Sequence, residues 1–195
     1  HWRAALDSGQ FSTIAALALA DSPEPEDSER LRTLLVHPMA LVRRAALRGL
    51  AALSPPDLGQ VLERALTDPS PRVVRAALRI FSKSSESLTE GTLVRALAAQ
   101  TGWSTRSSLL LSSNQLPKWA GLSFLLAQRV SAPETDQPAL DRAFERWLAH
   151  SNRRYAPLDS ESASRILGQI RAVDRQSPDP RWATLESIVH AFARP

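Results

Sequence analysis

An all-α fold built from tandem helix pairs is predicted by three features of this 195-residue sequence: an internal repeat, a scarcity of glycine, and prolines that stand between apolar segments. Only 7 glycines occur among many alanines and leucines, which favours helix along the whole chain. The 14 prolines suit the first turns of helices, where a backbone N–H has no helical partner. Hydrophobic residues make up 43% and charged residues 23%, the balance of a folded chain rather than a disordered one.

The repeat appears when residues 31, 62 and 93 are aligned, which is a spacing of 31 residues. "LRTLLVHPMALVRRAALRGL" (31–50) then lies over "LERALTDPSPRVVRAALRIF" (62–81), and leucines, alanines and arginines coincide. The third copy, "LVRALAAQTGWSTRSSLLLS", keeps Leu93, Leu97, Arg106 and Leu109 in the same register. A period of this length is typical of helical repeat arrays, in which each copy is one helix pair.

Each copy contains signals for the start of two helices. Ser54 precedes two prolines and is expected to cap the first helix of its copy. Ser87 and Glu90 have the spacing of a capping box for the first helix of the next copy. Ser70 and Pro71 are expected at the start of a second helix.

The second helices are predicted to bury a stripe of small residues. In one copy the apolar positions follow helical spacing, and so do their equivalents in the preceding copy: Val73, Ala76, Ala77, Ile80 and Phe81, then Val42, Ala45, Ala46, Gly49 and Leu50. Small residues at the centre of the stripe let neighbouring helices approach closely. In the third copy Ser107 and Ser108 replace the two alanines and are also small.

The segments outside the clear repeats (28–112) are predicted to be irregular helix pairs. Residues 1–20 form one pair with a break at Gly9, and the acidic segment 21–29 is expected to be a solvated linker. Further helices are expected over 117–130, 136–150, 159–173 and from Pro180 onward. We expect one helical repeat domain over residues 1–195, of about five helix pairs, within a larger protein because the chain begins without Met.

The apolar helix, the Asp-Pro turn and the following Val-x-x-Ala-Ala-Leu pattern resemble HEAT repeats, in particular the short bacterial type. The resemblance implies a right-handed α–α superhelix, whose second helices line a concave surface. It also implies a polar ladder between copies, with a turn aspartate at Asp68 and a helix arginine at Arg43. His37, Val74 and Thr105 depart from the ladder pattern, so an interrupted ladder is expected.

No catalytic or metal-binding motif is found in the sequence. It has no cysteine, no Gly-rich phosphate loop and no G-x-S-x-G or H-E-x-x-H pattern, and its four histidines are scattered. The His-Glu pairs of the iron-binding HEAT-like hydroxylases are absent too. We therefore expect a non-catalytic protein without metal or cofactor, located in the cytoplasm and without a membrane-inserted segment.

The side of the second helices opposite the core stripe is the candidate partner-binding surface. In order of the copies, its residues are Arg44 and Arg48, then Arg72, Arg75 and Arg79, then Trp103 and Arg106. Arginine forks bind carboxylates or phosphates, so we expect a scaffold that binds an acidic or extended protein partner. Three alternatives stay open: solvated helix-face arginines only, a nucleic-acid-binding or DNA glycosylase-like HEAT protein, and a lyase-type enzyme.

Overall fold

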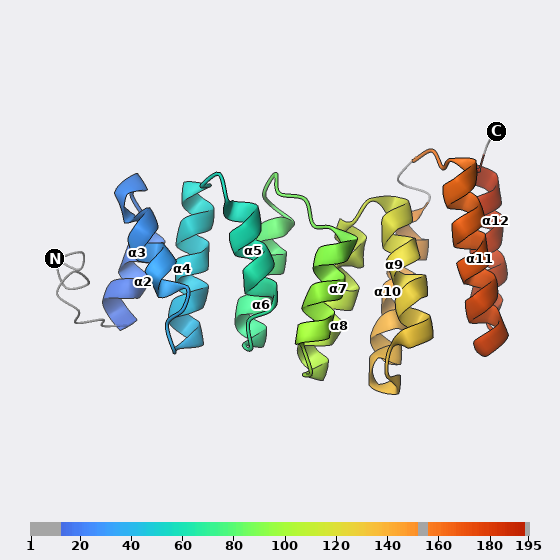
Figure 1. Ribbon diagram of the computed structural model, residues 1–195, viewed down its shortest axis with the longest axis horizontal. Coiled ribbons are helices and arrows are strands. Elements are labelled where there is room, and N and C mark those ends of the chain that lie inside the picture. The colour runs from blue at the N-terminus through green and yellow to red at the C-terminus, as the bar shows by residue number, and fades with distance from the viewer. Residues whose placement is uncertain (1–12, 152–155, 194–195) are drawn as a thin grey trace. The chain divides into compact units, whose positions relative to one another are not determined.

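The computed structural model describes residues 13–151 and 156–193, and Figure 1 shows that these residues are helical. The predicted first helix and the break at Gly9 lie outside the described residues. The packing divides the chain into two compact units: unit 1 consists of His1–Ser87 and Arg95–Thr101, and unit 2 of Leu88–Val94 and Gly102–Pro195. The expectation of a single domain over residues 1–195 stays a prediction.

Unit 1 is built from a short row of helix pairs. Its helices are α2 (Thr13–Asp21), α3 (Ser28–Leu34), α4 (Ala40–Leu53), α5 (Leu58–Leu66) and α6 (Pro71–Phe81), with a 3₁₀ turn, η1 (Pro25–Asp27), before α3. α3 packs on α4 and α5 packs on α6, and α4 lies between α2 and α6. The next helix, α7 (Glu90–Ala99), is divided between the two units.

Unit 2 continues the pairing of consecutive helices. It holds α8 (Trp103–Leu111), α9 (Lys118–Ser131), α10 (Gln137–Ser151), α11 (Ser160–Gln176) and α12 (Pro180–Phe192), with the 3₁₀ turns η2 (Ser112–Gln115) and η3 (Glu134–Asp136). α9 packs on α10 and α11 packs on α12, and α9 also contacts α11. The all-α prediction is confirmed, and the four helices expected after residue 112 begin within one residue of their predicted starts.

The buried stripe of the second helices is confirmed. All five predicted core positions of α4 are buried, as are those of α6 except the half-buried Ile80. Val74 and Leu78 are buried as well, because α6 packs against α5 on one side and α4 on another. A Cβ atom on Gly49 would lie 3.1 Å from the Cα atom of Ala20, so α2 and α4 cross where there is no room for a side chain.

Two predicted helix starts and one predicted linker are corrected by the structure. Ser54 ends α4 in the left-handed conformation, with φ of 48°, and Asp57 occupies the N-cap position of α5. In α7 the hydroxyl of Thr89, rather than Ser87, accepts a hydrogen bond from the Thr92 N–H. Asp27 in the acidic segment is fully buried and accepts bonds from the Glu24 N–H and from Arg30, so it belongs to the start of α3 and not to a solvated linker.

A buried polar contact joins the two helix pairs of unit 1. Arg43 donates two hydrogen bonds of 2.8 Å to the carboxylate of Asp68, and two more to the carbonyls of His37 and Pro38. The same carboxylate accepts the Ser70 N–H at the start of α6, at 2.8 Å. The turn of one pair is thereby tied to the turn of the next, as the resemblance implied for these two residues.

The stripe predicts a large difference between two neighbouring substitutions in α6. Ala76→Leu adds bulk at a position that is 3% exposed, and overpacking of this kind costs about 1–3 kcal/mol. Arg79→Ala changes an exposed side chain and should cost no more than about 0.5 kcal/mol. Thermal melting of both variants tests this, and equal shifts in Tm would contradict the assigned helix face.

The start of α12 predicts a loss of stability in acid. Asp179 accepts hydrogen bonds from the side chain and the backbone N–H of Arg181, and these lower its pKa to about 2. Because the pKa of Asp179 is lower in the folded state, its contribution to the free energy of unfolding is complete above the ordinary pKa of 3.8 and is lost as pH falls toward 2. The Tm of Asp179→Asn, measured across this range, should fall less steeply than that of the wild type. Parallel curves would contradict the assignment.

Candidate partner-binding face

Five arginines lie on the two neighbouring helices α4 and α6, four of them at repeat-equivalent positions, and we call the five the arginine face. They are Arg44 and Arg48 of α4, with Arg72, Arg75 and Arg79 of α6. Residues three and four apart share one side of a helix, and α4 packs directly against α6. Arg44 is half-buried and the other four are exposed. The face therefore combines two short rows of guanidinium groups within unit 1.

Three arginines of the arginine face, Arg48, Arg72 and Arg79, have at most an exposed carboxylate partner among the described residues. Arg48 lies 3.4 Å from the carboxylate of Asp21, and both side chains are more than half exposed. Exposed pairs of this kind contribute little to stability. Among the described residues, no carboxylate forms an ion pair with Arg72 or Arg79. These two guanidinium groups are therefore available to an acidic ligand.

Trp103 and Arg106 lie in α8 of unit 2 and are described separately from the arginine face of unit 1. Trp103 is the first residue of α8 and its side chain is 53% exposed. The Trp103 side chain therefore lies at the surface of unit 2 and not in its core.

Arg106 has a structural partner that the repeat alignment did not indicate. Its guanidinium donates to Asp136 over 2.8 and 2.6 Å, and the two side chains are only 17% and 1% exposed. Arg106 follows the N-cap Gly102 by four residues, as Arg43 follows the N-cap Met39. It is thus equivalent to Arg43 rather than to Arg75, and the expected gap in the ladder at Thr105 is corrected. The sequence signal for this shift is the extra residue before Gly102, where the other copies have a proline turn.

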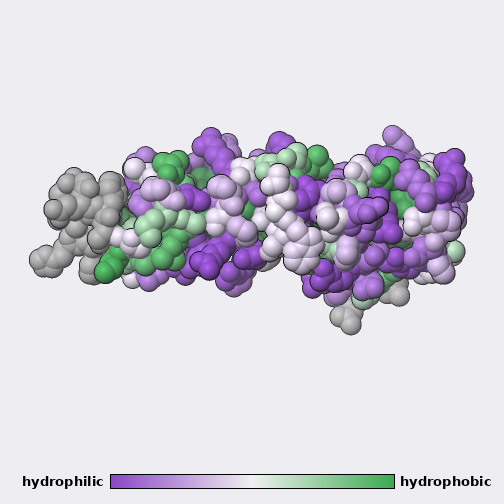
Figure 2. Space-filling view, turned by 90° about the horizontal axis from the view of Figure 1, so that it is seen from below, coloured by the Kyte–Doolittle hydropathy of each residue, from purple (hydrophilic) through white to green (hydrophobic). Residues whose placement is uncertain are grey.

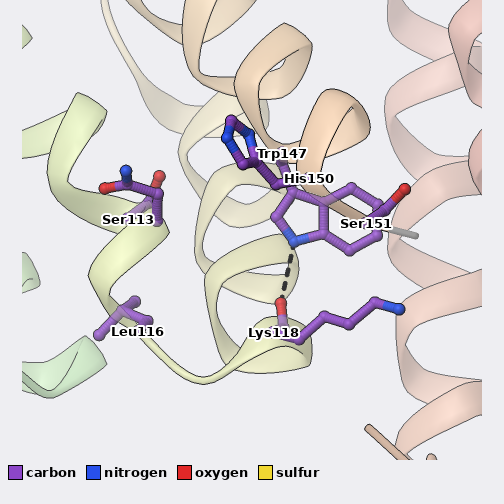
Figure 3. A pocket seen from close by; sticks show the side chains of 7 residues that line it. Ser113, Leu116, Lys118, Trp147, His150 and Ser151 are labelled. Carbon is purple, nitrogen blue, oxygen red and sulfur yellow. Dashed lines mark hydrogen bonds between the residues drawn. The ribbon is translucent and has the colours of Figure 1, made fainter. Parts of the chain in front are cut away.

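A small recess in unit 2 gathers several polar side chains (Figure 3). It has a volume of about 70 Å³ and lies beside Ser113, Lys118, Trp147 and His150. Trp147 donates its indole N–H to the carbonyl of Lys118 at 2.9 Å. The Lys118 side chain extends away from Ser113 and His150, and its amine lies 3.6 Å from the ring centre of Phe192. Burial lowers the pKa of Lys118. The amine packs on the rings of Trp119 and Phe192.

Two further kinds of site were sought in the described part of the chain. Within it, no group of three or more histidine and carboxylate side chains is placed to hold a metal ion. Over the same residues, no helix is both long and apolar enough to cross a membrane.

Comparison with known families supports the resemblance found in the sequence. The family model for HEAT repeats matches residues 5–81, which include α2 to α6 and the whole arginine face. HEAT repeats generally serve as protein-interaction scaffolds and are typically non-catalytic. A comparison with curated proteins finds no match to the chain.

The reassignment of Arg106 predicts unequal effects of two arginine substitutions. Arg106→Ala leaves the Asp136 carboxylate buried without its partner, and breaking a buried pair costs about 3–5 kcal/mol. Arg72→Ala removes an exposed guanidinium and should stay within about 0.5 kcal/mol. Chemical denaturation of the two variants measures both values. A small cost for Arg106→Ala would return this residue to the candidate binding surface.

Proposed function

We propose, on the premise that residues 5–81 are HEAT repeats, that this protein is a non-catalytic scaffold that binds an acidic protein segment through the arginine face. The observation that carries the proposal is the pair of arginine rows on α4 and α6, two helices that pack side by side; four of the five arginines are exposed. In the family the second helices line the concave surface, which is the side on which extended partners are held.

The spacing of the arginines suits an extended or helical acidic segment. Arg72, Arg75 and Arg79 follow one side of α6 at intervals of three and four residues. A planar guanidinium grips a carboxylate with two parallel hydrogen bonds, so a row of them favours several carboxylates on one segment. Arg44 and Arg48 repeat the arrangement on α4, which lets the same segment cross both helices.

Charge reversal on α6 tests the arginine face. Arg75→Glu with Arg79→Glu replaces attraction by repulsion, and we expect about a tenfold or greater loss of affinity for a glutamate-rich peptide. Arg75→Lys keeps the charge but loses the planar fork, so it should weaken binding by a smaller factor. Fluorescence anisotropy measures the affinities, and a melting curve for each variant shows that the fold is kept.

A matched control is available on another helix. Arg142 and Arg146 of α10 are exposed and are also four residues apart, so reversing both makes the same change of charge in unit 2. This control should bind the peptide like the wild type. Equal losses in the two double variants would show that only net charge matters and would contradict the arginine face.

A nucleic-acid ligand is separated from an acidic peptide by direct competition. Phosphate contacts make affinity fall steeply with salt. A single-stranded oligonucleotide that binds more tightly than the peptide, and loses affinity in Arg75→Glu/Arg79→Glu, would favour the nucleic-acid alternative. An oligonucleotide that fails to displace the peptide at physiological salt would support the protein scaffold.

A further inference from the structure

Another recess, in unit 1, lies between α3 and α5, the first helices of the pairs α3–α4 and α5–α6. It has a volume of about 350 Å³, within the range of small binding pockets. The recess separates α3 from α5, and the buried residues Leu47, Val61 and Val73 form its base. Leu35 and Ala65 are half-buried on its walls. Because Leu47 is 0% and Val73 only 2% exposed, the accessible apolar surface of the recess lies on its walls, at Leu35 and Ala65.

Apolar surface continues beyond the mouth of this recess. Val36, at the end of α3, is 84% exposed although it lines the same recess. Figure 2 shows hydrophobic surface beside hydrophilic surface in the part of the molecule that carries α2 to α6. Exposed apolar groups next to a recess favour a ligand that is larger than the recess, because the contact continues outside it.

Arg64 is the arginine of the recess that is left for a ligand. Arg32 donates two hydrogen bonds of 2.7 Å to Asp57 and lies 3.4 Å from Glu29, and Arg43 is held by Asp68. Arg64 is exposed and interacts with Asp57 through charge alone; among the described residues it forms no ion pair with a carboxylate. A carboxylate of a ligand can therefore approach the Arg64 guanidinium without displacing an ion pair.

We infer that this recess is a docking site for an acidic peptide segment of a protein partner, which places one large apolar side chain in the recess and a carboxylate against Arg64. Charge complementarity at Arg64 selects the acidic residue, and the accessible apolar surface of Leu35, Val36 and Ala65 selects the apolar one. The site is independent of the arginine face, because it lies between the first helices whereas the arginine face lies on the second helices.

The test uses two labelled peptides of equal charge and the full 195-residue chain. One peptide carries a Leu-Phe pair between glutamates, and the other has two alanines in place of that pair. Both are titrated against Arg75→Glu/Arg79→Glu, which removes the arginine face. We expect the Leu-Phe peptide to bind this variant at least about tenfold more tightly than the alanine peptide. The proposed function is tested separately, by the affinity of the alanine peptide for the unmodified chain; no binding there would contradict the arginine face but not the recess.

Two substitutions locate the binding in the recess. Ala65→Phe fills the space and should abolish binding of the Leu-Phe peptide without lowering Tm. Arg64→Glu changes an exposed side chain and should weaken binding of the same peptide about tenfold. If Ala65→Phe unfolds, Arg64→Glu alone tests the inference. Equal affinity for the two peptides would overturn the inference, as would binding that neither substitution weakens. Displacement of the Leu-Phe peptide by decanoate supports the apolar recess, whereas binding of decanoate without any binding of the peptide overturns the peptide as its occupant.

Discussion

The bidentate contact between Arg43 and Asp68 is the constraint on which the arrangement of unit 1 depends. One guanidinium holds the carboxylate of the next turn and two carbonyls of its own turn, and the carboxylate also holds the Ser70 N–H where α6 begins. The two side chains are 13% and 11% exposed, so solvent screens the contact far less than it screens a surface pair. The hydrogen bonds that Arg43 donates to Asp68 raise the pKa of Arg43.

Apolar packing and this polar contact have different roles in unit 1. Burial of the small stripe supplies attraction without direction, because the hydrophobic effect depends only on the area removed from water. Ala45 and Ala76 permit a close approach of α4 and α6 but do not by themselves select one register along the helix axis. The Arg43 fork can satisfy Asp68 in one register only, since both donors must meet both oxygens. The spacing of the arginine rows and the shape of the recess between α3 and α5 both follow from that register.

The same chemistry recurs in unit 2 with a displaced sequence position. Arg106 and Asp136 form the equivalent buried pair, although a constant spacing of 31 residues assigns the arginine position to Thr105. One added residue before α8 rotates every later side chain by about 100° relative to the alignment, because a helix turns once in about 3.6 residues. A residue expected at the surface is therefore buried in an ion pair, and Thr105 takes a core position.

Local patterns in the sequence by themselves determined the helices, most of their bounds, the buried stripe and the side of α4 and α6 on which the arginines lie. Each of these depends on residues within one or two helical turns, where apolar period, proline and glycine act directly on the backbone. Only the tertiary structure decided that Arg106 is paired, that Asp27 is buried, and that α3 and α5 leave a recess beside Arg64. These features join side chains about 30 residues apart or depend on how whole helices pack, and no local period encodes such distances.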